Sequence, residues 1–252
     1  MKKIISVINQ KGGVGKTTTS TNLSCGLALA GFRVLLIDLD PQAHSTIGMG
    51  MADHCEYFVQ DILINGRDIR EVVCKTPTEN LDIIAANIHL SKATNTLFNE
   101  HFREMRLHNA LLKETDNYDF VVIDCHPSLG ILEINALYAC NFILVPTDTG
   151  RYSLEGFADL IDTIRGIMGS DANIRDYLRI LVTIFDSREK GINDWVDEQL
   201  AEFSEIVLST KIRKITGIKQ AQIAEQPIMV YDEKSPGTED YNKLTQELLS
   251  IW

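Results

Sequence analysis

Short apolar runs alternate with helical patterns along the whole chain. The clearest strand candidates are Ile4–Asn9, Val34–Asp38, Leu81–Ala85, Phe120–Asp124, Phe142–Pro146 and Ile180–Ile184. Most of these runs are continuously apolar, which is typical of parallel strands that are buried on both faces. The helix candidates are Thr17–Leu29, Phe102–Lys113, Leu154–Met168, Asn193–Phe203 and Thr238–Ile251. The alternation predicts βαβ units and an α/β fold with a doubly wound, mostly parallel sheet.

No internal repeat, low-complexity segment or long linker divides the 252 residues, so residues 1–252 are expected to form a single domain. Neither a signal peptide nor an apolar run of about 20 residues is evident, which predicts a cytoplasmic location and no membrane contact.

The five cysteines are odd in number and lack CxxC spacing, so reduced, buried thiols are expected. A formal charge of −11 argues against a protein covered with nucleic-acid contacts, but it leaves room for a local basic patch.

The first strand candidate runs directly into a glycine-rich loop and then into a helix. The loop reads Gln10-Lys11-Gly12-Gly13-Val14-Gly15-Lys16-Thr17-Thr18. Glycines at such a turn let backbone N–H groups point inward toward phosphate oxygens, and the helix N-terminus adds partial positive charge. Lys16 can then reach the β- and γ-phosphates, and the Thr17 hydroxyl can bind Mg²⁺. The sequence therefore predicts a P-loop fold that binds a nucleotide through residues 11–18, with a plain glycine-rich turn as the alternative.

The loop departs from the simple P-loop pattern in one informative place. Gln10 stands where GxxxxGK[ST] has glycine, and Lys11 adds a second lysine. This string resembles the deviant Walker A box of the ParA/MinD family of ATPases. The resemblance implies that ATP is the nucleotide and that Lys11 reaches across a dimer interface to the partner's phosphates, so that dimerisation depends on ATP. An exposed, solubilising lysine is the alternative interpretation of Lys11.

Carboxylates that complete such a site follow two other strand candidates. The segment from Asp38 through Asp40-Pro41-Gln42 resembles the family's switch I box. This implies that Asp40 orients the attacking water and that Asp38 supports the Mg²⁺ shell, although either could instead cap a helix. Asp124 ends an apolar Walker B strand and is predicted to hold Mg²⁺ through water. The predicted catalytic residues are thus Lys11, Lys16 and Asp40. Hydrolysis of ATP to ADP is expected to be slow, because no arginine finger is evident in cis.

Three residues differ from the pattern of that family. His126 lies in the presumed switch II, where the family usually has proline. A catalytic role, a change in loop stiffness and a contact with the dimer partner all remain open for it. Asp148 and Gly150 occupy positions where the family commonly has Gln and Glu. The family's dimer and ribose contacts therefore do not carry over to these two residues.

The resemblance covers nearly the whole chain and is strongest to the short ParA/Soj-type DNA-partition ATPases. It implies an ATP-bound homodimer that binds double-stranded DNA without sequence preference, associates with the nucleoid, and is released when a ParB-type partner stimulates hydrolysis. The segment Lys211–Lys219 carries four positive charges and no acid. The residues predicted to contact DNA phosphates are Arg188, Lys211, Lys214 and Lys219. The alternatives are a solvated basic edge or, for the segment around Arg213, a place beside the adenine base.

Two other functions share the nucleotide motifs. A MinD-like positioning ATPase would need a basic amphipathic helix at its C-terminus, but residues 241–252 contain one Lys, one Glu and no basic face. A metabolic ligase that uses ATP to activate a carboxylate should lack Lys11, and it would form ADP only when its acceptor is present.

Overall fold

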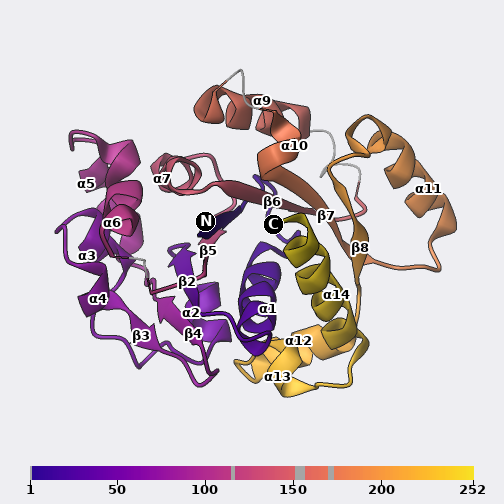
Figure 1. Ribbon diagram of the computed structural model, residues 1–252, viewed down its shortest axis with the longest axis horizontal. Coiled ribbons are helices and arrows are strands. Elements are labelled where there is room, and N and C mark those ends of the chain that lie inside the picture. The colour runs from indigo at the N-terminus through magenta and orange to yellow at the C-terminus, as the bar shows by residue number, and fades with distance from the viewer. Residues whose placement is uncertain (1, 115–116, 151–156, 170–172) are drawn as a thin grey trace.

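A computed structural model describes residues 2–114, 117–150, 157–169 and 173–252 (Figure 1). Within them, eight strands form one sheet in the order β3-β4-β2-β5-β1-β6-β7-β8. The strands are β1 (Lys3–Val7), β2 (Val34–Leu39), β3 (Cys74–Lys75), β4 (Leu81–Ile84), β5 (Phe120–Cys125), β6 (Phe142–Thr147), β7 (Leu178–Phe185) and β8 (Val207–Arg213). Neighbouring strands are parallel except for β3 and β4. The predicted doubly wound, mostly parallel sheet is confirmed.

All six predicted strands are present, and their bounds shift by at most two residues at either end. The two edge strands, β3 and β8, were not predicted. β3 has only two residues. In β8 only Leu208 and Ile212 are buried, because an edge strand that is partly open to water has no continuous apolar run to identify it.

Helices precede or follow most strands. The longer ones are α1 (Lys16–Leu29), α5 (Leu90–Leu97), α6 (Arg106–Glu114), α7 (Ile131–Ala139), α9 (Phe157–Met168), α11 (Lys190–Gln199), α12 (Thr216–Ile223) and α14 (Pro236–Ile251). Short helical segments are α2 (His44–Gly48), α3 (Val59–Leu63), α4 (Ile69–Val72), α10 (Ile174–Tyr177), α13 (Ile228–Tyr231), η1 (Arg103–Met105) and η2 (Ala201–Phe203).

The five predicted helices correspond to α1, η1 with α6, α9, α11 with η2, and α14. The start of the third prediction, residues 154–156, lies outside the described residues. The helices that were not predicted include α2, α7 and α12, each of which contributes to the site described below. α2 is only five residues long, which is too short for a helical period to be recognised.

Helices cover both faces of the sheet, with α7 and α9 on one side and α1, α12 and α14 on the other (Figure 1). Two buried apolar clusters fill the spaces between sheet and helices. Successive residues of β2 alternate between them, since Leu35 and Ile37 belong to one cluster and Val34 and Leu36 to the other. Burial on both faces explains the continuously apolar strands. No helix in the described ranges combines the length and apolar character needed to cross a membrane.

The expectation for the cysteines holds for three of the five. Cys25, Cys125 and Cys140 are buried free thiols. Cys55 and Cys74 are instead half-buried and paired as a disulfide, so the prediction of reduced, buried thiols is wrong for them. The fold is the reason, because it brings the two Cα atoms to 6.0 Å across 19 residues of chain.

Candidate functional site

The phosphate loop forms the turn between β1 and α1. Gly13 and Gly15 have φ angles of 80° and 82°, a left-handed conformation that glycine adopts without steric cost. A Cβ added at Gly13 would meet nothing within 4 Å. Thr183 of β7 donates from Oγ1 to the carbonyl of Val14 at 2.8 Å, which fixes the loop to the sheet. The loop therefore has the backbone geometry and the open space that a phosphate-binding nest requires.

Lys16 is the first residue of α1, and its side chain is almost completely buried. Its Nζ donates to the carbonyl oxygen of Lys11 at 2.7 Å. Burial lowers the pKa of Lys16, and the nearby carboxylate of Asp124 partly opposes that shift. A buried ammonium group is strongly stabilised by an arriving anion, so Lys16 is suited to bind phosphate.

Lys11 lies at the start of the loop and forms an ion pair within its own subunit. Its Nζ lies 3.1 and 3.2 Å from the two carboxylate oxygens of Asp148, which follows β6. The backbone N–H of Lys11 donates to Asn9 Oδ1 at 3.0 Å. The lysine is thus not a freely solvated surface residue.

Asp38 and Asp124 occupy opposite positions on the neighbouring strands β2 and β5, and both are fully buried. Asp124 accepts hydrogen bonds from Ser20 Oγ at 2.9 Å and Ser45 Oγ at 2.7 Å, and Thr17 also hydrogen-bonds it. Burial raises the pKa of Asp124. For Asp38, burial and then the nearby Asp124 raise the pKa to about 7. The two carboxyl groups therefore favour a cation or a shared proton between them.

The segment after β2 is folded back onto these carboxylates. Asp38 Oδ2 accepts from both N–H and Oγ1 of Thr46, at 2.8 and 2.7 Å, and Asp38 Oδ1 accepts from Asp40 N at 3.1 Å. Asp40 is nearly buried, and its Oδ1 accepts from Gln42 N at 2.8 Å. Neither aspartate is the N-cap of α2, because that position is Ala43. Asp38 nevertheless satisfies a backbone N–H in the first turn of α2 from outside the helix.

The loop after β5 is held by Glu133 of α7. The carboxylate Oε2 of Glu133 accepts from Ser128 Oγ and from Gly130 N, each at 2.8 Å. His126 Nδ1 lies 3.3 Å from Ser128 Oγ. This contact within the loop supports the interpretation that His126 affects loop stiffness.

No group of three or more His, Cys, Asp or Glu side chains in the described ranges is arranged to hold a metal ion. Thr17 and Asp124 are in contact, but by themselves they supply too few ligands. Mg²⁺ commonly takes one or two protein oxygens together with substrate phosphates and water. The residues present therefore fit a Mg²⁺ ion that arrives with a nucleotide.

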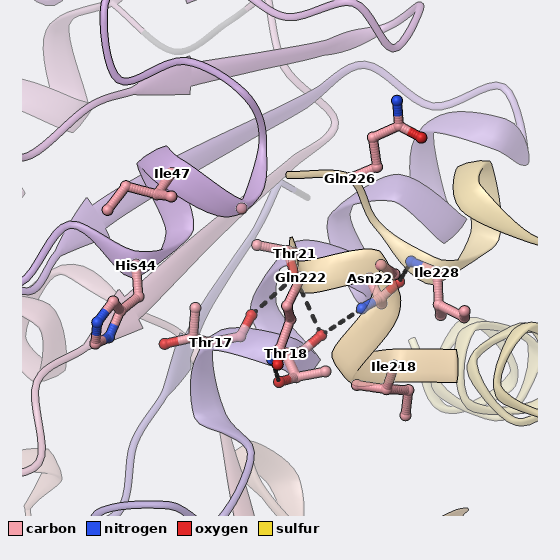
Figure 2. A pocket seen from close by; sticks show the side chains of 12 residues that line it. Thr17, Thr18, Thr21, Asn22, His44, Ile47, Ile218, Gln222, Gln226 and Ile228 are labelled. Atoms are coloured by element: carbon pink, nitrogen blue, oxygen red, sulfur yellow. Dashed lines mark hydrogen bonds between the residues drawn. The ribbon is translucent and has the colours of Figure 1, made fainter. Parts of the chain in front are cut away.

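A pocket of about 350 Å³ opens beside the end of the loop. Figure 2 shows His44 and Ile47 of α2 on one side of it and Ile218 of α12 on the other. Thr18 lines the pocket between them and accepts a hydrogen bond from Gln222 Nε2 at 3.0 Å. The volume is within the range of small-ligand pockets, so the pocket can accept a group attached to phosphates on the loop.

Two of the four residues predicted to contact DNA form ion pairs with aspartates. Arg188 pairs with Asp186 two residues before it, at 2.6 Å. Lys211 pairs with Asp197 of α11 at 2.9 Å and lies 5.0 Å from the centre of the Phe185 ring. Arg188 and Asp197 are largely exposed, and exposed ion pairs exchange readily with other anions.

The other two predicted DNA residues, Lys214 and Lys219, are exposed, and neither forms an ion pair with another residue that the structure describes. Arg213 behaves differently, because its guanidinium pairs with Asp240 at 2.6 Å and with Glu239 at 2.7 Å. The Arg213 side chain thus faces α14, and the predicted position beside a base remains a prediction for this segment.

The sequence motifs did not reveal the hydroxyl residues that surround the carboxylates. Ser20 lies one turn after Lys16 on α1, and its Oγ also donates to the Lys16 carbonyl at 3.0 Å. Ser45 and Thr46 follow the switch I box closely, but five residues of α2 give no periodic signal. The available signal was the pair of adjacent hydroxyl residues, Ser45 and Thr46, shortly after the acidic end of β2.

Comparison with known proteins gives a consistent result. Residues 2–180 match the family described as AAA domain. The sporulation initiation inhibitor protein Soj of Bacillus subtilis is 41% identical, over 98% of this chain and 98% of its own length. A chromosome-partitioning ATPase Soj of Treponema pallidum is 37% identical, over 99% of this chain and 98% of its own. The crystal structure of cobyrinic acid a,c-diamide synthase from Mycobacterium smegmatis with bound ATP analog and magnesium is 31% identical, with a TM-score of 0.84 over 100% of this chain and 96% of that one.

Proposed function

Because this chain belongs to the Soj/ParA family of partition ATPases, we propose that it is an ATP-dependent DNA-partition switch. Its ATP-bound homodimer binds double-stranded DNA without sequence preference, and hydrolysis stimulated by a ParB-type partner releases the dimer. The observation that carries the proposal is the contact of the phosphate loop and α1 with a buried carboxylate: Thr17 and Ser20 hydrogen-bond Asp124, whose charge acts on Lys16.

ATP binds through the backbone N–H groups and side chains of residues 11–18. Lys16 exchanges the Lys11 carbonyl for phosphate oxygens, so the buried ammonium gains an anionic partner. Thr17, Asp124 and Asp38 support Mg²⁺, which neutralises developing phosphate charge when bound. Asp40, whose backbone N–H is held by Asp38, orients the attacking water.

The DNA surface is the edge formed by the end of β8 and the start of α12. Lys214 and Lys219 are its most available cations, since both are exposed. Lys211 and Arg188 join them by exchanging Asp197 and Asp186 for DNA phosphates. A homodimer presents two copies of this edge, which doubles the number of DNA phosphates that its cations can neutralise.

Anisotropy of a random-sequence DNA duplex tests the proposal with ATP, ADP or no nucleotide at two salt concentrations. Tight binding is expected only with ATP and Mg²⁺, and it should weaken steeply with salt. The double variant Lys214→Ala/Lys219→Ala should bind more weakly and should lower the salt slope by about 4 for a dimer that loses four phosphate contacts. Lys92→Ala, an exposed lysine on α5, is the matched control. Absence of ATP-dependent binding by the unmodified protein would reject the DNA switch.

A carboxylate-activating ligase is the second candidate, because one structurally similar protein carries the name of a synthase. The second loop lysine, Lys11, argues against it. Product analysis separates the two functions: a partition ATPase forms ADP and phosphate without any acceptor, whereas a ligase forms them only when its acceptor is added.

A further inference from the structure

Two residues that depart from the family pattern lie together around Lys11. Asp148 and Gly150 are 137 and 139 positions from Lys11 in sequence, yet the fold places all three at the carboxyl ends of the neighbouring strands β1 and β6. Both carboxylate oxygens of Asp148 lie within 3.2 Å of Lys11 Nζ. The pair is part-buried, with side-chain exposures of 32% for Lys11 and 21% for Asp148.

Gly150 completes this arrangement in two ways. Its backbone N–H donates to Asp148 Oδ1 at 2.9 Å, which orients the carboxylate toward the lysine. A Cβ at position 150 would lie 3.1 Å from Asp148 Oδ1, which is a crowded contact, and 3.4 Å from Lys11 Nζ, at the limit of an ordinary one. A larger side chain there would push against the ion pair, so the glycine leaves the room that the pair needs.

We propose that Asp148 and Gly150 form a holder that keeps Lys11 within its own subunit until ATP dimerisation. The inference rests on the proposed function, in which Lys11 reaches the phosphates bound to a second subunit. One ammonium group cannot make close contact with Asp148 and with distant phosphates at the same time, so each subunit must break its pair when the dimer forms. Asp148 is thus a positioning residue that raises the ATP and protein concentrations needed for dimerisation.

The test measures the dimer dissociation constant by sedimentation with a saturating non-hydrolysable ATP analogue and Mg²⁺. Asp148→Asn keeps the shape of the side chain and removes its charge. Releasing one part-buried pair is expected to lower the dimer dissociation constant about fivefold. A dimer has two such pairs, so the expected decrease is about 25-fold. Gly150→Ala should tighten the dimer by a smaller factor, because it loosens the pair without changing charge. Asp119→Asn is the matched control, since it breaks the Arg33–Asp119 pair at the opposite end of the sheet.

Affinity for ADP and the melting temperature are measured on the same proteins. The proposal expects a tighter dimer from Asp148→Asn with ADP affinity unchanged, a gain that general damage to the fold does not produce. If the wild-type protein dimerises with the analogue and Asp148→Asn dimerises equally well or less well, the proposed role of Asp148 in holding Lys11 is wrong. Wild type and variants that all stay monomeric would instead overturn the proposed ATP dimer itself. Weaker dimerisation by Gly150→Ala would contradict the role given to the glycine.

Discussion

Thr46→Val is the most direct test of how α2 is attached to the buried carboxylates. Threonine and valine are both β-branched and have nearly the same shape, so the substitution removes a hydroxyl without opening a cavity. The Thr46 hydroxyl is almost completely buried and makes two hydrogen bonds. It donates to Asp38 Oδ2 at 2.7 Å and accepts from the backbone N–H of Ala86 at 3.0 Å.

The expected cost follows from those two bonds. A hydrogen bond to a charged carboxylate, the form that Asp38 takes above pH 7, contributes about 1.5–3 kcal/mol, and a neutral one about 0.5–1.5 kcal/mol. The Ala86 N–H would also be left buried without its acceptor, so the larger values apply. We expect the free energy of unfolding to fall by about 3 kcal/mol, which lowers the melting temperature of a chain of this size by roughly 6–12 °C.

Urea unfolding of the nucleotide-free protein measures this change. The midpoint should fall while the m-value stays the same, because the surface exposed on unfolding is unchanged. Thr94→Val on α5 is the matched control, since among the described residues the Thr94 hydroxyl bonds only the Ser91 carbonyl, at an exposed site, and its cost should be below about 0.5 kcal/mol. A cost below about 1 kcal/mol for Thr46→Val would refute the attachment of α2 through this hydroxyl.

Three further predictions concern the charged residues of the site. Lys16→Ala should weaken ATP binding or turnover at least about tenfold, through loss of a charged phosphate contact, and normal ATPase activity would reject the loop assignment. Asp40→Ala should lower hydrolysis at least about 100-fold and keep the ATP dimer on DNA, and a variant that is monomeric with ATP would argue against water positioning. Between the ordinary Asp pKa of 3.8 and the value of about 7 for Asp38, the native protein holds a proton that the unfolded chain has lost. The free energy of unfolding of the metal-free protein should therefore fall with rising pH in this window, and it should fall less for Asp38→Asn. Urea unfolding at pH 5 and pH 8 measures this fall, and an equal fall for wild type and Asp38→Asn would contradict the prediction.

Local patterns in the sequence were enough to predict the sheet and the phosphate loop. The six central strands are continuously apolar because helices cover both faces, so burial alone identifies them. The loop is equally local, since its glycines, lysines and threonines all lie within residues 10–18 and form one motif. The family resemblance then led directly to Asp38, Asp40 and Asp124, whose positions at strand ends follow from the sheet.

The contacts that hold these residues were decided only by the tertiary structure. Ser45 reaches Asp124 across 79 residues, and Lys11 reaches Asp148 across 137. Neither pair has a period or spacing in the sequence, because strand order and crossovers determine which loops meet at the edge of a sheet. The partly exposed edge strand β8 and the five-residue α2 were missed for a related reason, since too few of their residues are buried to leave a pattern. Sequence thus determined which groups are proposed to bind a nucleotide, whereas the long-range packing of the parallel sheet decided which side chains hold those groups in place.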